Sequence, residues 1–107
     1  MPSPTLSPRC PIRTTLDLVG GKWQLLILAH LGSETVGFAD LRGRLPGISD
    51  KVLAATLSRL AEDLLLERTE AGYRRTAAGA AVEPLLGAMV EFAGAYGNLV
   101  GIAATAE

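Results

Sequence analysis

Two adjacent glycines, Gly20 and Gly21, restrict the fold of this chain most strongly. An apolar pattern begins directly behind them and places hydrophobic residues at positions 23, 26, 27 and 31. This spacing is typical of a helix with one buried face, so we expect a helix over residues 22–31. Residues 13–19 predict a shorter helix that ends at the glycines. The chain therefore begins with two helices that meet at a glycine break.

A Pro-Gly pair at positions 46 and 47 separates two further helical patterns. The first pattern covers residues 38–45. The second starts at Ser49, whose hydroxyl can cap the open backbone N–H groups, and continues to about residue 63. Leu53, Leu57, Leu60 and Leu64 share one face of this helix and should lie in the core. A helix, a tight turn and a capped helix form a helix-turn-helix pattern, which taken alone leaves DNA binding and a plain solvated helix face equally open.

The second half of the chain predicts a β-hairpin and a long helix. Residues 65–69 and 73–76 are expected to be strands, with Glu70, Ala71 and Gly72 between them. A helix over residues 77–99 should follow. Pro84 lies inside it, and an interior proline costs roughly 3 kcal/mol. We therefore expect either a kink near residues 80–81 or a main helix that begins around Glu83.

Composition indicates one domain with an additional apolar surface. The chain has 107 residues, a net charge of −1, 49% hydrophobic residues and a mean hydropathy of +0.30. Such a charge argues against indiscriminate nucleic-acid binding. The high hydropathy favours burial in a dimer, although the same surface could pack on its own monomer. The last helix should supply the dimer interface, through Leu85, Met89, Phe92 and Tyr96.

Several function classes are not expected from this sequence. No apolar run approaches the roughly 20 residues of a membrane span, and residues 1–9 predict a flexible arm rather than a signal peptide. Residues 10–99 should form the domain and residues 100–107 a tail. His30 stands alone, without a metal-ligand cluster, and no catalytic set of residues is present. We therefore expect a cytoplasmic protein that is not an enzyme and has no cofactor, metal or membrane partner.

Taken in order, these segments resemble the HxlR family of MarR-like bacterial transcription regulators. The resemblance covers roughly residues 10–97. It rests on Cys10-Pro11, Gly20-Gly21-Lys22-Trp23, Phe38-Ala39-Asp40-Leu41-Arg42, Leu45-Pro46-Gly47-Ile48-Ser49-Asp50-Lys51-Val52-Leu53, Tyr73-Arg74-Arg75-Thr76 and Gly79. It implies a winged helix-turn-helix: a mainly helical fold with a small hairpin as the wing, dimerised through its terminal helices.

The resemblance also implies a recognition helix in the major groove of double-stranded DNA. Lys51 would reach a guanine edge or a phosphate, Ser58 would donate a hydrogen bond, and Ala54 or Ala55 would touch a thymine methyl. The remaining expected DNA contacts are Ser49, Arg42, Arg44, Arg59, Arg68, Arg74 and Arg75. The chain departs from the family where it has two alanines instead of polar residues and a shorter wing with an acid at its turn. These departures indicate modest sequence specificity or readout of DNA shape.

Two residues are candidates for a regulatory response. In part of the family the cysteine equivalent to Cys10 senses oxidants, and Arg9 and Arg13 would supply positive charge nearby. The alternative is an inert residue packed at the interface. Trp23 should anchor the core, with an effector pocket near the dimer interface as the alternative. We expect a repressor that binds a palindromic operator as a homodimer and is open to a redox or small-molecule effector. The alternative is a small-molecule sensor or protein-interaction module with weak DNA affinity.

Overall fold

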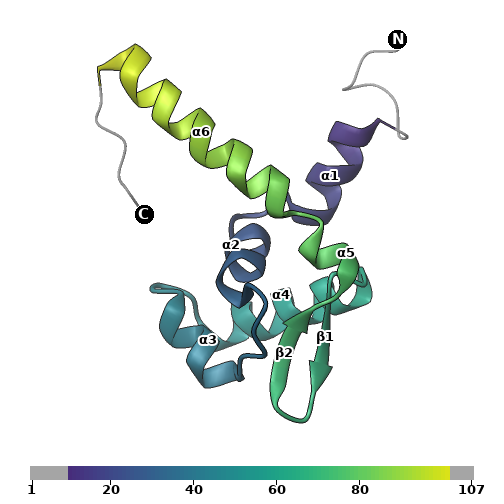
Figure 1. The fold of residues 1–107 in the computed structure, drawn as a ribbon. Coiled ribbons are helices and arrows are strands. Elements are labelled where there is room, and N and C mark those ends of the chain that lie inside the picture. Colours follow the sequence, from purple (N-terminus) through teal and green to yellow (C-terminus); the bar gives the residue numbers. More distant parts are fainter. Residues whose placement is uncertain (1–9, 102–107) are drawn as a thin grey trace.

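The computed structural model describes residues 10–101 and has the predicted order of elements (Figure 1). In chain order they are α1 (Pro11–Val19), α2 (Lys22–Leu31), α3 (Phe38–Arg44), α4 (Asp50–Glu62), β1 (Leu66–Thr69), β2 (Gly72–Arg75), α5 (Ala77–Ala80) and α6 (Glu83–Val100). α1 starts two residues earlier than predicted, because Pro11 suits the first turn of a helix. The proposed arm and most of the proposed tail lie outside the described residues, and residue 100 belongs to α6.

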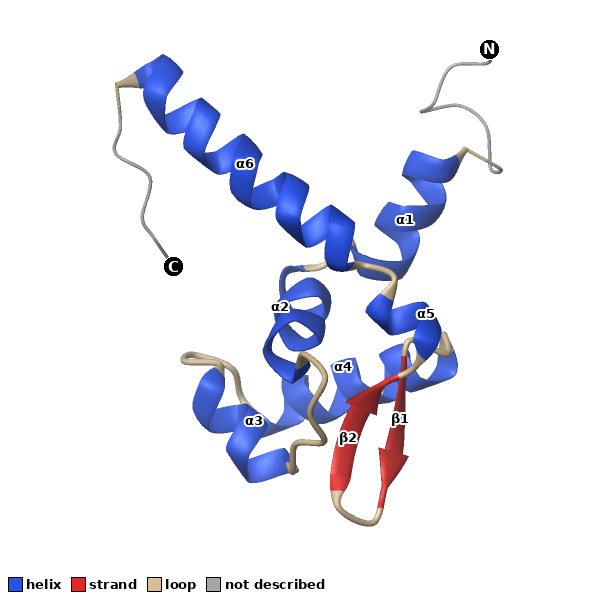
Figure 2. Cartoon of the chain, in the orientation of Figure 1, coloured by secondary structure: helices blue, strands red, loops and turns tan. Residues whose placement is uncertain are grey.

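The helices and the hairpin form a body from which two helices project. α2, α3, α4 and the hairpin make up the body, while α1 and α6 extend from one side of it and diverge (Figures 1 and 2). The core lies where α2 meets α3, α4 and the hairpin. Its fully buried side chains are Ile27, Leu28, Leu31, Leu41, Leu53, Leu57, Leu60 and Leu66. This core fixes α3 and α4 against α2.

α4 begins as predicted but ends sooner. The Ser49 hydroxyl accepts a hydrogen bond from the Val52 amide at 3.1 Å, which confirms the expected N-cap. The prediction that Leu64 belongs to the core is wrong, because its side chain is 71% exposed. The helix ends at Glu62, and Leu64 adopts a left-handed φ of 62°. That turn takes Leu64 off the leucine face, and Leu65 enters the core instead.

The hairpin is short and is fastened to the body by one further bridge. Thr69 pairs with Gly72, so that only two residues form the turn. Tyr73 pairs with Val36, in the segment between α2 and α3. Gly72 has a φ of 139°, and a Cβ there would lie 2.4 Å from the Val36 carbonyl oxygen. Glycine therefore permits both the turn and this close approach.

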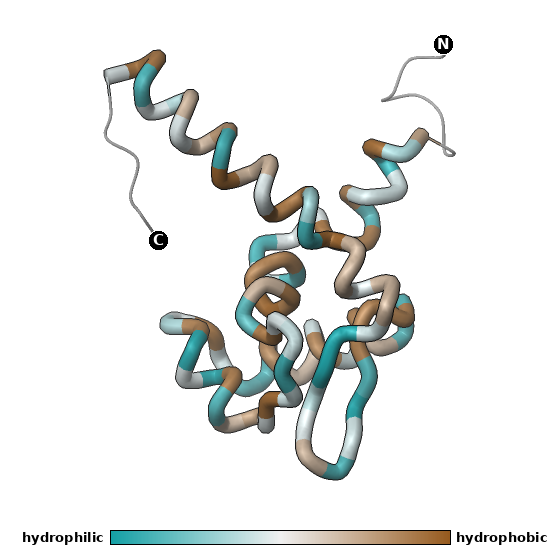
Figure 3. Tube along the Cα trace, in the orientation of Figure 1, coloured by the Kyte–Doolittle hydropathy of each residue, from teal (hydrophilic) through white to brown (hydrophobic). Residues whose placement is uncertain are grey.

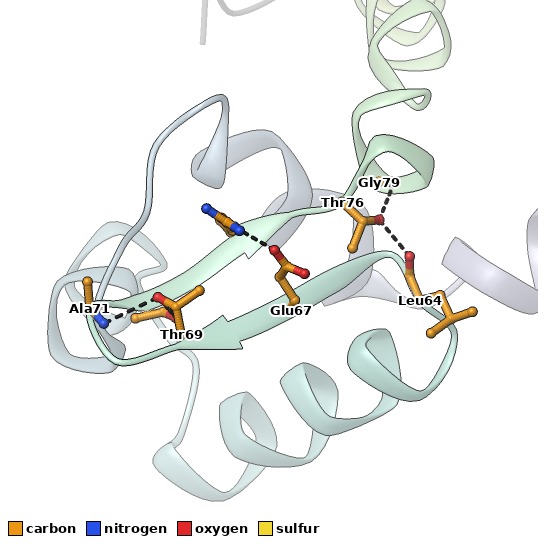
Figure 4. A network of polar contacts seen from close by, with 8 residues as sticks. Leu64, Glu67, Thr69, Ala71, Thr76 and Gly79 are labelled. Carbon is orange, nitrogen blue, oxygen red and sulfur yellow. Dashed lines mark hydrogen bonds and ion pairs between the residues drawn. The ribbon is translucent and has the colours of Figure 1, made fainter.

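The predicted break in the last helix is confirmed as a separate α5 and α6. α6 begins at Glu83, so Pro84 occupies its first turn, where proline is tolerated. Thr76 caps α5: its hydroxyl donates to the Leu64 carbonyl at 2.6 Å and accepts from the Gly79 amide at 3.1 Å (Figure 4). Thr76 thus joins the end of α4, the hairpin and the start of α5.

α6 exposes much of its apolar surface. Hydrophobic residues recur along the helix, away from the body (Figure 3). Its exposed side chains include Met89, Val90, Phe92, Tyr96, Leu99 and Val100. The helical stretch Ala77–Val100 is long and apolar enough for a membrane span by length and composition alone, since an 18-residue window within it has a mean hydropathy of 1.2. The sequence analysis did not identify such a run, because Glu83, Pro84 and Glu91 interrupt it.

Candidate nucleic-acid interface

One face of α4 is free of the core and exposed. Leu53, Leu57 and Leu60 bury the opposite face against α2 and the hairpin. The exposed residues predicted to contact DNA are Lys51, Ala54, Ala55, Ser58 and Arg59. Ser49 precedes them, and its hydroxyl oxygen accepts the cap hydrogen bond. The structure therefore brings these residues together on one side of α4.

The two arginines of α3 connect that helix to its neighbours. Arg42 pairs with Asp50, in the first turn of α4, at 2.8 Å. Arg44 donates to the His30 carbonyl at 3.0 Å and lies 3.5 Å from Glu34. The first pair stabilises the turn between α3 and α4, and the second contact links α3 to the end of α2.

The wing offers two exposed arginines. The Arg68 guanidinium lies 6.0 Å from the centre of the Tyr73 ring, a weak cation–π contact. Arg74 pairs with Glu67 across the hairpin at 2.6 Å. Glu70 lies at the exposed tip. The charges of the strands are thus in reach of a phosphate, while the tip itself is acidic.

Arg75 does not lie on the surface with them. Its side chain is only 7% exposed. The guanidinium pairs with Glu83 at 2.6 Å and donates to the Leu28 carbonyl at 3.4 Å, while its buried Nε has no hydrogen-bond partner within the described part of the chain. Our expectation of a phosphate contact at Arg75 does not fit this geometry. Arg75 connects β2, α2 and the first turn of α6.

Most cations of this face are paired with carboxylates. Arg42, Arg44, Arg59 and Arg74 each have an acidic partner. Within residues 10–101, Lys51 and Arg68 form no ion pair. Exposed ion pairs contribute only about 0–1 kcal/mol each, so a DNA phosphate can replace the carboxylate partner. Lys51 at the N-terminal end of α4, like Arg68 on the wing, would therefore contact a phosphate without first breaking an ion pair.

An apolar groove of about 900 Å³ separates the two projecting helices. α1, the beginning of α2 and α6 form its walls, with Ile12, Leu16, Leu25, Leu26, Leu85 and Met89 among the lining residues. Phe92 and Tyr96 continue the exposed face along α6 and stack with their ring centres 6.1 Å apart. Trp23 does not line the groove: it is partly buried against the core, with the Lys22 ammonium 4.8 Å from its ring centre. The geometry therefore favours the core role of Trp23 over the effector-pocket role.

Cys10 lies at the N-cap of α1, beside this groove. Its side chain is 7% exposed, and its carbonyl accepts a hydrogen bond from the Thr14 amide. Arg13 follows within the first turn of α1, while Arg9 lies outside the described residues. Pro11 begins the helix directly after Cys10. The thiol is thus covered at the outer end of one groove wall, where α1 begins (Figure 1).

Val52 is a residue of this face that the sequence analysis missed. Its side chain is 41% exposed, although it is flanked in sequence by Lys51 and the fully buried Leu53. Helical spacing contains the signal, because position 52 is three residues before Ala55 and therefore adjacent to it on the helix surface.

No group of three or more possible metal ligands occurs among the described residues.

Together, a helix-turn-helix with an exposed second helix and an adjacent hairpin define a winged helix-turn-helix DNA-binding domain. A family model described as HxlR-like helix-turn-helix matches residues 18–100. The chain belongs to this family of transcriptional regulators, which are not enzymes. It is 34% identical over 100 residues to the uncharacterized HTH-type transcriptional regulator YdzF of Bacillus subtilis, covering 86% of this chain and 92% of YdzF.

Further relatives agree with this assignment. The putative regulatory protein MalR of Fusobacterium mortiferum is 44% identical over 63 residues, which cover 58% of this chain and 59% of MalR. The redox regulator HypR in its reduced form superposes with a TM-score of 0.74 at 28% identity, over 84% of this chain and 95% of HypR. Quinone-bound YodB from B. subtilis superposes with a TM-score of 0.72 at 28% identity, over 77% of this chain and 93% of YodB.

Truncation of the two neighbouring arginines of β2 should destabilise the protein to different extents. We expect Arg75→Ala to lower the free energy of unfolding by about 2–3 kcal/mol, because it removes a buried charged donor from Glu83 and the Leu28 carbonyl. Arg74→Ala should change that free energy by less than about 1 kcal/mol, since its ion pair is exposed. Urea denaturation at one fixed protein concentration measures both. Equal destabilisation by the two variants would contradict the assigned role of Arg75.

Proposed function

We propose that this protein is a repressor that binds a palindromic operator as a homodimer. The exposed face of α4 carries this proposal: a capped helix held away from the core, with Lys51 at its N-terminal end and no ion pair to that lysine among the described residues. A helix of this kind fits the major groove, and its first turns contact base edges. Lys51 would contact a guanine edge or a phosphate, and Ser58 would donate a hydrogen bond. Because a bound dimer covers the DNA beneath it, repression is the sign of regulation that we infer.

The remaining contacts would go to the DNA backbone. Arg42 and Arg44 on α3, Arg59 on α4, and Arg68 and Arg74 on the wing are exposed or half-buried near the recognition face. The acidic partners of the paired arginines would be exchanged for phosphates on binding. Each guanidinium would then have an anionic partner both in the free protein and in the DNA complex. Each contact would therefore add less to the affinity than a contact from an unpaired arginine.

The homodimer is supported by the exposed apolar surface of α6. Leu85 and Met89 line the groove beside α1, and Phe92 and Tyr96 continue the same helix into solvent. Exposed apolar patches of this extent mark an interaction surface. A second copy of this chain satisfies it, because a two-fold dimer buries the same patch on both subunits. Two α4 helices related in this way would lie in successive major grooves and match a palindrome.

A second candidate function is a sensor or interaction module with weak DNA affinity of its own. The observation that favours it is the pairing of the exposed arginines with carboxylates, together with the acidic wing tip and the alanines of α4. Under this alternative the groove between α1 and α6 would bind a small molecule or a protein segment, and DNA would be bound without salt-sensitive specificity.

A salt titration of DNA binding separates the two functions. We expect the protein to bind a duplex from its own upstream region with an affinity that falls steeply with salt, as phosphate contacts require. Lys51→Ala should weaken binding about tenfold and lower the salt slope by about one, and Arg59→Ala should weaken it less. Arg13→Ala on α1 removes one positive charge outside the proposed DNA-binding face, and this variant should bind DNA like the parent. Fluorescence anisotropy at several salt concentrations gives both quantities.

If no duplex is bound more tightly than random DNA at any salt concentration, the alternative function is favoured. If Lys51→Ala and Arg13→Ala both bind like the parent, the placement of α4 in the groove is wrong.

Placing a charge on α6 should dissociate the dimer. Met89 is 47% exposed in the single chain, so Met89→Glu leaves the core intact while introducing a carboxylate into the proposed interface. We expect light scattering to give twice the 11.2 kDa chain mass for the parent and the chain mass itself for Met89→Glu. Leu64→Glu, also exposed but outside α1 and α6, should remain dimeric. A monomeric parent at tens of micromolar would contradict the proposal.

We also propose that Cys10 makes DNA binding responsive to oxidants. The similar structures include a regulator described by its redox role and one in a quinone-bound form. In this chain Cys10 is the single cysteine, and it caps the helix that forms one wall of the groove. Because its thiol is buried, any added group must displace the start of α1. That displacement would alter the proposed dimer surface.

Oxidation should therefore weaken operator binding through Cys10 alone. We expect a mild oxidant to lower the affinity of the parent at least several-fold and a thiol reductant to restore it, while Cys10→Ser binds DNA equally well under both conditions. Anisotropy with and without oxidant measures this response. A response that survives in Cys10→Ser would exclude the thiol and direct attention to the exposed Met89.

A further inference from the structure

Val52 and Ala55 form a small apolar patch that extends from the edge of the exposed α4 face toward its middle. Val52 is 41% exposed and Ala55, one helical turn later, is exposed beside it. Lys51 and Ser58 lie on one side of this pair, and Arg59 follows both residues along the helix, four positions after Ala55 and seven after Val52. A single exposed valine is ordinary on a protein surface. This one differs because it lies in the first turns of the helix that a helix-turn-helix presents to base edges.

Three polar groups close to Val52 and Ala55 are engaged within the protein, whereas Lys51 and Ser58 lie beside them without such a contact among the described residues. The Thr56 hydroxyl donates to the Val52 carbonyl at 2.7 Å, so its proton is directed into the helix backbone. The Arg59 Nε donates to Asp63 at 3.1 Å, toward the C-terminal end of α4. The Ser49 hydroxyl oxygen is occupied by the Val52 amide. The surface at Val52 and Ala55 is therefore formed by methyl groups, and the free donors Lys51 and Ser58 lie beside it.

We propose that Val52 and Ala55 together recognise the 5-methyl group of a thymine in each operator half-site. This inference rests on the proposed function, since it requires α4 to enter the major groove. The thymine methyl is the apolar feature of a base pair in that groove, and a side chain that contacts it favours thymine over unmethylated pyrimidines. Contact between the two apolar surfaces removes both from water, which supplies the free energy of the preference.

The charges around Val52 and Ala55 fit a thymine methyl group in DNA better than an apolar protein partner. The apolar pair is small and lies next to Lys51, which forms no ion pair within the described region, and Arg59 follows Ala55 by one helical turn, in a surface pair with Asp63. Cations around a small apolar centre match a groove in which methyl groups lie between rows of phosphates. The polar residues Lys51 and Ser58 would contact the base pairs next to the one that contains this thymine.

Deoxyuridine substitution isolates this methyl group. The full chain is first used to select its preferred duplex from a random library, and each thymine of a half-site is then replaced by deoxyuridine, which removes the methyl and nothing else. We expect one thymine, or two adjacent ones, at which the substitution weakens binding about fourfold, the factor for one buried apolar carbon. Substitution elsewhere should leave the affinity unchanged.

Matched variants assign the effect to the side chain. In Val52→Ala the loss on deoxyuridine substitution should fall below twofold, because the thymine methyl then keeps only the small Ala55 side chain as a close apolar partner. Leu64→Ala, which truncates an exposed apolar residue outside this face, should retain the fourfold loss. Both positions are exposed in the parent, and circular dichroism checks that both variants are folded.

The same methyl occurs on 5-methylcytosine, and a further arm separates the two sources. With cytosine and guanine at the sensitive position, tighter binding to the methylated than to the unmethylated duplex would support a site that accepts the methyl of either pyrimidine. Equal binding to the two would support a site restricted to thymine.

The possible failures are distinguishable. Selective, salt-dependent binding without a deoxyuridine effect at any thymine would overturn the methyl inference and leave the proposed function standing. A deoxyuridine effect that persists in Val52→Ala would overturn the assignment to Val52. Failure to select any duplex would overturn the proposed function and the inference with it.

Discussion

The guanidinium of Arg75 lies where three parts of the molecule meet. It connects the second strand of the hairpin to the Leu28 carbonyl of α2 and to Glu83 at the start of α6. Because Arg75 is buried, this connection is stiffer than the exposed ion pairs elsewhere. α2 packs against α4 in the core. By connecting α6 to α2, Arg75 therefore helps to set the direction of α6 relative to the recognition helix. In the proposed dimer that direction determines how far apart two recognition helices lie, which is the quantity that an operator has to match.

The exposed arginines differ from Arg75 because their ion pairs lie at the surface. Arg42, Arg59 and Arg74 are paired on the surface, where each pair contributes little to stability and can be rearranged. The chain thus separates its arginines by burial: one positions the elements, and the others remain available to a polyanion. A net charge of −1 is compatible with DNA binding on these terms, because the carboxylates that balance the arginines lie beside them and not only elsewhere on the molecule.

Local sequence signals predicted the elements well because each depends on neighbouring residues. The Gly20-Gly21 break, the Pro46-Gly47 turn, the Ser49 cap and the helix start near Pro84 were all confirmed, and comparison with known families confirmed the fold class. Tertiary position was harder to predict. Leu64 continues the leucine spacing, but the helix ends before it. Arg75 alternates with Arg74 in a strand, and only the packed fold shows that Arg75 faces inward. Val52 was overlooked because it lies at the border between the exposed and buried faces of α4, next to the fully buried Leu53.

The two-residue turn of the hairpin limits the reach of the domain along DNA. Only Glu70 and Ala71 extend beyond the last strand pair, and Tyr73 ties the hairpin back to Val36. The minor groove that flanks each half-site would thus stay open to solvent and to a nuclease. In the proposed complex the outer edges of the operator would be free to change in evolution, and the preserved sequence would be concentrated beneath the two recognition helices.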